Sequence, residues 1–64
     1  SFYPFSQDEY LTIAGQWLSA LGATPAQIDA ARADALLWAL ERGSRSGRVA
    51  YQFARDYMGR QAAA

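Results

Sequence analysis

The 64-residue chain contains no cysteine, no histidine and no lysine. Without cysteine, it can form neither a disulfide nor a thiolate site for a metal ion. Without histidine, it lacks the commonest general base and the commonest metal ligand. Without lysine, it has no P-loop, because that motif needs a lysine to contact the phosphates. These absences argue against an enzyme complete in itself, and we expect neither a catalytic residue nor a metal site here.

The chain also has no excess of either charge, because six arginines balance six acidic residues. Dedicated nucleic-acid binders are usually strongly basic, so nucleic acid is an unfavoured partner. No apolar run approaches the ~18 residues of a membrane span, and the first residues do not resemble a secretory signal. We therefore expect a cytoplasmic location and no membrane contact.

The length allows one small domain, which we take as residues 1–64. Its first helix is predicted from residues 6–9, where Ser6 and Glu9 have the spacing of a capping box. Phe5 and Tyr10 are placed to form a hydrophobic staple beside this start, and Gly22 ends the helix. The apolar residues between follow helical spacing and form one stripe: Tyr10, Ile13, Ala14, Trp17, Leu18 and Leu21.

Two more helices follow the first. A second capping box, Thr24 with Gln27, and a proline at residue 25 predict a helix that runs to Arg42 and ends at Gly43. Its inward residues are expected to be Ile28, Ala31, Ala35, Trp38, Ala39 and the neighbouring leucines. The third helix is predicted to begin at Arg45 or Ser46 and to stop before Gly59. Its inward residues are expected to be Ala50, Phe53, Ala54 and Tyr57.

No alternating apolar pattern predicts a strand. The expected fold is therefore all-α, a small three-helix bundle with helices at about 7–21, 25–42 and 46–58. The C-terminal half of the second helix is apolar over a wide arc, so we expect that helix to be central. We also expect Trp17 and Trp38 to be largely buried.

The segment 43–48 is the strongest candidate for a binding site. The third helix begins there with free backbone N–H groups, with Arg45 and Arg48, and with no acid in its first turn. Such a helix start attracts anions, and arginine pairs with phosphate oxygens in a planar fork. The ordinary interpretation is a solvated face, on which Arg45, Arg48, Gln52 and Arg55 lie together and pair with Glu41 or Asp56.

Two segments of the chain carry a family resemblance, FYPFSQDEYLTI at residues 2–13 and SGRVA at residues 46–50. Together they resemble the C-terminal helical lid of an AAA+ ATPase. In that family a loop with glycine and arginine opens the third lid helix and carries the sensor 2 arginine. Arg48 is the best match to this arginine, and Arg45 is the second choice. More narrowly, SFYPFSQDEYL and RGSRSGRVAYQFARD resemble an uncharacterised bacterial family of predicted AAA+ ATPases, known only as a domain of unknown function.

The resemblance implies that this lid is part of a larger ATPase, whose core domain is absent from these residues. ATP or ADP with Mg²⁺ would bind between core and lid, with Arg48 at the γ-phosphate. Ile13 and Gly47 match family positions that touch the adenine. The implied partner is the AAA+ core domain of the same parent chain, and the parent is a possible oligomer. Alone, the lid would not hydrolyse ATP.

Two other functions remain open. In a helix-turn-helix-like module, the helix at 46–58 would present Arg45, Arg48, Gln52 and Arg55 to a nucleic-acid groove. In a small protein-interaction bundle, the aromatic segment at residues 2–5 would be the contact surface, because so small a bundle has difficulty covering it. A P-loop upstream in the parent gene would favour the lid, and strong salt-dependent DNA binding would favour the first alternative.

Overall fold

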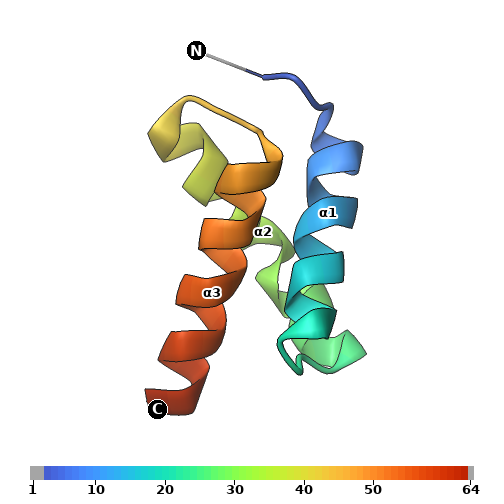
Figure 1. Cartoon of the computed structure of the whole chain (residues 1–64), viewed down its shortest axis with the longest axis vertical. Helices are drawn as coiled ribbons and strands as arrows, with labels where there is room; N and C mark the ends of the chain where they lie inside the picture. The colour runs from blue at the N-terminus through green and yellow to red at the C-terminus, as the bar shows by residue number, and fades with distance from the viewer. Residues whose placement is uncertain (1–2, 64) are drawn as a thin grey trace.

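The computed structural model describes residues 3–63 and contains three α-helices. These are α1 (Gln7–Ala20), α2 (Pro25–Arg42) and α3 (Gly47–Ala63). Helices α1 and α3 lie side by side and run in the same direction, while α2 crosses behind them (Figure 1). Residues 3–63 contain no β-strand. The all-α, three-helix fold class predicted from the sequence is therefore confirmed.

Both predicted capping boxes are present. The Ser6 hydroxyl accepts the Glu9 backbone N–H at 3.2 Å, and the Glu9 carboxylate accepts the Ser6 N–H at 2.9 Å. Thr24 and Gln27 exchange the equivalent bonds at 3.2 and 2.8 Å. Two groups of Ser6 lower the pKa of Glu9. The hydrogen bond from the Ser6 backbone N–H has the larger effect, and the Ser6 hydroxyl has the smaller one.

The two helix ends next to the loops also follow the local sequence. Gly22 has φ 98° and Gly43 has φ 63°, the left-handed region that favours glycine. Helix α1 stops at Ala20 and α2 at Arg42, within one residue of the predicted ends.

The predicted end of the third helix is wrong, because α3 continues through Gly59 to Ala63. A glycine inside a helix costs about 1 kcal/mol relative to alanine, which this segment offsets locally. Arg60 pairs with Asp56 one turn earlier at 2.9 Å, and alanines complete the last turn. The predicted start of this helix at Ser46 is one residue early, because α3 begins at Gly47. Ser46 precedes the helix, and its hydroxyl accepts the Val49 N–H at 3.2 Å.

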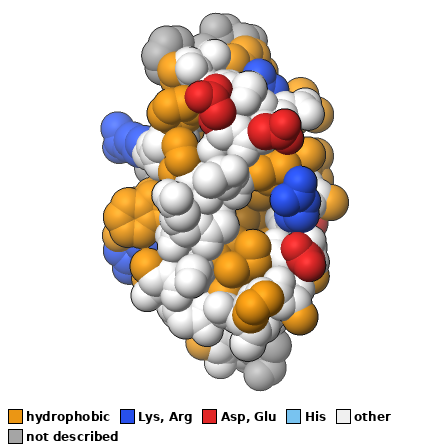
Figure 2. Space-filling model, turned by 90° about the vertical axis from the view of Figure 1, so that its right-hand side faces the viewer, with side chains coloured by type: hydrophobic (Ala, Val, Ile, Leu, Met, Phe, Trp, Pro, Cys, Tyr) orange, Lys and Arg blue, Asp and Glu red, His pale blue; other side chains and the backbone are white. Residues whose placement is uncertain are grey.

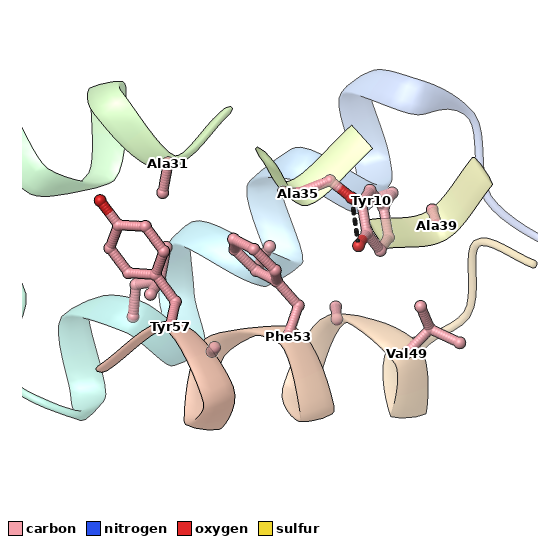
Figure 3. Packing of buried hydrophobic residues seen from close by; sticks show 11 residues of the cluster. Tyr10, Ala31, Ala35, Ala39, Val49, Phe53 and Tyr57 are labelled. Atoms are coloured by element: carbon pink, nitrogen blue, oxygen red, sulfur yellow. Dashed lines mark hydrogen bonds between the residues drawn. The ribbon is translucent and has the colours of Figure 1, made fainter. Parts of the chain in front are cut away.

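The core is narrow and rich in alanine (Figure 3). Its largest fully buried side chains are Tyr10, Leu18 and Phe53. The Tyr10 hydroxyl reaches across from α1 and donates a hydrogen bond to the Ala35 carbonyl of α2 at 2.8 Å. The buried cluster comprises Tyr10, Ala14, Leu18, Ala31, Ala35, Ala39, Val49, Ala50, Phe53, Ala54 and Tyr57.

Several residues expected inside lie on the surface. Trp17 is 40% exposed and packs edge-on against Tyr51, with 4.5 Å between ring centroids, so its predicted burial is wrong. Leu21, also placed on the buried stripe, is 41% exposed. Trp38 is only half-buried, packed edge-on against Phe53.

The expected central position of α2 is also wrong. Leu37 is 53% exposed and Leu40 is 69% exposed, whereas Ala31, Ala35 and Ala39 face the core. Only the alanine side of α2 is covered, because two neighbouring helices cannot enclose the whole of its apolar arc.

Replacing Ser6 by alanine should cost about 1 kcal/mol, because the Glu9 N–H loses its cap. For a domain of this size, the melting temperature should then fall by about 4–8 °C, measured by circular dichroism. Thr12→Ala is the matched control, since Thr12 is exposed within the same helix and alanine is the best helix former. An unchanged melting temperature for Ser6→Ala would show that this cap does not stabilise α1.

The buried phenol should make stability depend on alkaline pH. Burial raises the pKa of Tyr10 from 10.0 to about 12, although the nearby Arg42 charge acts in the opposite direction. The folded state therefore holds this proton more tightly than the unfolded state. The resulting stability is fully present below pH 10 and is lost as the pH rises towards 12.

Urea unfolding between pH 9 and 12 tests this dependence. The free energy of unfolding should fall more steeply for the wild type than for Tyr10→Phe, by on the order of 2 kcal/mol across that interval. The other tyrosines and the arginines are common to both proteins. Parallel slopes would mean that Tyr10 ionises as easily in the folded state as in the unfolded state.

Candidate functional site

The loop between α2 and α3 brings the candidate arginines to one end of the bundle. After Gly43, the Ser44 N–H bonds back to the Ala39 carbonyl at 3.1 Å and closes the end of α2. The loop then passes beside the segment that precedes α1 (Figure 1). Arg45 and Arg48 thus lie on the two sides of the α3 start, near the beginning of α1.

The start of α3 retains the features expected of an anion site. Its first turn contains Arg48 and no acidic residue. Ser46 satisfies two early donors, through its hydroxyl to Val49 and its carbonyl to Ala50. The backbone N–H groups of Gly47 and Arg48 remain at the positive end of a 17-residue helix, where the dipole favours negative charge.

Arg45 is held by the N-terminal segment. Its Nε donates to the Phe5 carbonyl at 3.1 Å, and its guanidinium lies 4.6 Å from the centre of the Tyr3 ring. The residue is half-buried and precedes α3. The prediction that Arg45 shares one helix face with Arg48, Gln52 and Arg55 is therefore wrong. The remaining three do lie exposed on α3.

Arg48 is exposed, and within residues 3–63 it makes no side-chain hydrogen bond, ion pair or contact over an aromatic ring. The expected ordinary partner, Asp56, pairs with Arg60 instead. Arg48 is therefore the arginine of the segment that is free to bind a ligand, while Arg45 is engaged in holding the fold.

Gly47 and Ile13, the two residues matched to adenine contacts, occupy different surroundings. A Cβ added at Gly47 would meet nothing within 4 Å, so the backbone there is open to approach. Ile13 is half-buried and lines a shallow hollow of about 370 Å³ with Phe5, Asp8, Glu9 and Thr12. Neither arginine lines this hollow. Phe5 connects the two regions, because its carbonyl holds Arg45.

A second surface feature, an apolar groove, is not predicted by the sequence pattern. An apolar groove of about 330 Å³ runs between α2 and the N-terminal segment, lined by Tyr3, Gln7, Leu36, Leu37, Ala39, Leu40 and Arg45. The leucines of α2 that line it are the ones that the apolar pattern predicts in the core. The side view also shows hydrophobic side chains on both sides of a broad polar stripe (Figure 2). Of the predicted aromatic segment 2–5, Phe2 lies outside the described residues.

Other kinds of site find no support in the described part of the chain. Residues 3–63 hold no group of three or more acidic side chains placed to bind a metal ion. None of the three helices is both long and apolar enough to cross a membrane.

The chain belongs to the family described as Protein of unknown function (DUF815), whose model matches residues 1–61. No curated protein and no solved structure matches the chain significantly. Membership of this family does not itself specify an activity.

The two arginines should respond differently to substitution. Arg45→Ala should lower the free energy of unfolding by about 1–2 kcal/mol, because a partly buried hydrogen bond and a contact over Tyr3 are lost. Arg48→Ala should change it by less than about 0.5 kcal/mol, as exposed substitutions usually do. Urea unfolding of both variants measures the difference, and equal losses would contradict this division of roles.

Proposed function

We propose that this member of the DUF815 family is the nucleotide-sensing lid of a cytoplasmic AAA+ ATPase. Arg48 would be the sensor 2 arginine, and ATP would be bound mainly by a core domain outside these residues. The observation that carries the proposal is the pairing of a free, exposed Arg48 with an acid-free helix start beside an open Gly47. The resemblance of the segments around both features to AAA+ lids supports it.

The chemistry follows from charge. A γ-phosphate near the start of α3 would accept hydrogen bonds from the Arg48 guanidinium, each worth about 1.5–3 kcal/mol. Loss of that phosphate on hydrolysis would remove the contact. Because a ligand shifts a conformation only through such a differential contact, the lid angle could then differ between ATP and ADP states.

Arg45 would act as a positioning residue in this proposal. It ties the loop before α3 to Phe5 and Tyr3, so a displacement of the loop would be transmitted to the start of α1. Gly47 would let the phosphate or the base approach the backbone, and Ile13 would supply an apolar contact for the adenine. Mg²⁺ would be held by the core, since residues 3–63 offer no cluster of ligands for it.

The apolar groove gives the proposed core domain a surface to cover. Leu37 and Leu40 are more than half exposed, and Tyr3 lies with them at the same groove. An exposed patch of this kind usually marks an interaction surface. The groove supports equally the second candidate, a small protein-interaction bundle that binds a separate partner. A helix-turn-helix-like role has weaker support, because the net charge is zero.

The full-length protein allows the test of Arg48. Arg48→Ala should reduce ATP hydrolysis by about tenfold or more while leaving the melting temperature of the domain unchanged, because a γ-phosphate contact contributes roughly 1.5–3 kcal/mol. Arg55→Ala is the matched control, since Arg55 is exposed on the same helix two turns further from its start. Its effect on hydrolysis should be small.

Two results would contradict the proposal. One is normal hydrolysis with normal lid closure in Arg48→Ala, measured by fluorescence energy transfer between core and lid. The other is a parent gene without a P-loop. The isolated chain should show no ATP turnover under any condition, because it lacks lysine and a P-loop.

A further inference from the structure

Two surfaces of the bundle have opposite charge and lie along different helix seams. The first, called here the basic ridge, lies on the α1–α3 seam, where Trp17 packs on Tyr51. It also includes Arg55, which contacts Tyr51, and Arg48, which helical spacing places on the same face of α3. The second, called here the acidic hollow, has a volume of about 260 Å³ on the α2–α3 seam and is lined by Asp34, Leu37, Trp38, Glu41, Asp56 and Arg60.

The basic ridge is built from side chains that already order one another. Trp17 and Tyr51 pack edge-on at 4.5 Å, and the Arg55 guanidinium donates to the Tyr51 hydroxyl at 3.2 Å. No acidic residue occurs in α1 after Glu9 or in α3 before Asp56. The ridge therefore carries two positive charges beside an aromatic pair. Tryptophan, tyrosine and arginine are the residue types that contribute most to protein interfaces.

The acidic hollow has the complementary character. Its lining holds three carboxylates and one guanidinium, hence a net charge of −2, with Leu37 and Trp38 as its apolar part. Asp56 pairs with Arg60, whereas Asp34 and Glu41 form no ion pair within residues 3–63. Arg42 stacks on the Trp38 ring at 3.4 Å but does not line the hollow.

We infer that the partner of each surface is a second copy of this chain, with the basic ridge of one copy seated in the acidic hollow of the next. Charge complementarity carries the inference, because +2 on the ridge meets −2 in the hollow. The net charge of zero means that copies do not repel one another as they approach.

The positions of the two surfaces determine the kind of assembly. Tyr51 faces α1, whereas Asp56 and Arg60 line the hollow together with α2, so the surfaces lie on different sides of α3. Each copy can therefore use its ridge for one neighbour and its hollow for another. Such a heterologous contact leads to rings or open chains, in contrast to a closed two-fold dimer.

The contact should be weak in the isolated chain. A standard interface covers about 800 Å² per partner, which would be roughly a fifth of the 4026 Å² surface of this domain. The four residues of the ridge and the six that line the hollow are fewer than the about 20–30 residues a side of a standard interface. We expect association in the range of about 0.1–1 mM, weakened when salt screens the charges. The contact requires no ligand, so it can be tested separately from the proposed nucleotide role, with which it shares Arg48.

Sedimentation equilibrium of two variants and their mixture tests the inference. Gln52→Glu with Arg55→Glu reverses the ridge while leaving Arg48 in place. Asp34→Arg with Glu41→Arg reverses the hollow. All four positions are exposed. Each variant alone should associate at least about tenfold more weakly than the wild type, because opposite charges are replaced by like charges.

The mixture distinguishes this contact from any other. The ridge variant retains an intact acidic hollow, and the hollow variant retains an intact basic ridge. The reversed ridge and the reversed hollow also carry opposite charges, so an equimolar mixture should recover the association that neither variant shows alone. The wild type should grow beyond a dimer with rising concentration, and less so in about 0.5 M salt. Circular dichroism checks the fold of each variant. If a charge-reversal variant unfolds, the single substitutions Arg55→Gln and Glu41→Gln are milder replacements for it.

Three results would overturn the inference. The first is a wild type that stays strictly monomeric at about 1 mM, the upper end of the expected range. The second is undiminished association of either variant, which would locate the contact elsewhere, for example at the groove beside Tyr3. The third is a mixture of the two weakened variants that recovers no association. None of these results bears on the effect of Arg48→Ala on ATP hydrolysis.

Discussion

The hydrogen bond from Tyr10 to the Ala35 carbonyl is the interaction on which the arrangement of the bundle depends. It joins α1 to α2, with 2.8 Å between the Tyr10 hydroxyl and the carbonyl oxygen, in a core where Tyr10 is completely buried. The phenol can reach the backbone of α2 because the facing residues are alanines, which let the helices approach closely. A larger residue at Ala31, Ala35 or Ala39 would separate the helices and leave the hydroxyl buried without an acceptor, at a cost of about 1–3 kcal/mol.

This narrow core explains what remains outside it. Alanines form the buried side of α2, so Leu37 and Leu40 have no helix to pack on and are exposed. On the other seam, Trp17 is 40% exposed and packs on Tyr51 at the surface. The surfaces available for partners are therefore consequences of how tightly three short helices pack.

The segment around the start of α3 contains one arginine that is bound to the rest of the fold and, three residues later, one that is exposed to solvent. Arg45 is bound to the Phe5 carbonyl and stacks near Tyr3, which fixes where the loop lies relative to α1. Arg48, one turn later, extends into solvent at the positive end of the helix. A ligand that bound Arg48 would act on a helix start already connected to the rest of the bundle, which suits the sensing role that we propose.

The sequence by itself determined the three helices, because their boundaries depend on local chemistry. The pairs Ser6–Glu9 and Thr24–Gln27 cap their own helices, and Gly43 takes the left-handed conformation that ends α2. The one large boundary error, at Gly59, was also local, since an ion pair and alanines outweighed a single glycine. The position of Arg48 at an acid-free helix start was predictable for the same reason.

Tertiary structure alone decided which apolar residues were covered and which arginine was free. Helical spacing places four large residues on apolar faces, but a face is buried only where another helix packs against it. The four are exposed in the fold: Trp17, Leu21, Leu37 and Leu40. Arg45 and Phe5 are 40 positions apart, so no local pattern predicts their hydrogen bond. The basic ridge and the acidic hollow likewise exist only because α3 packs against both α1 and α2, which places charges that are neighbours in its sequence on different surfaces.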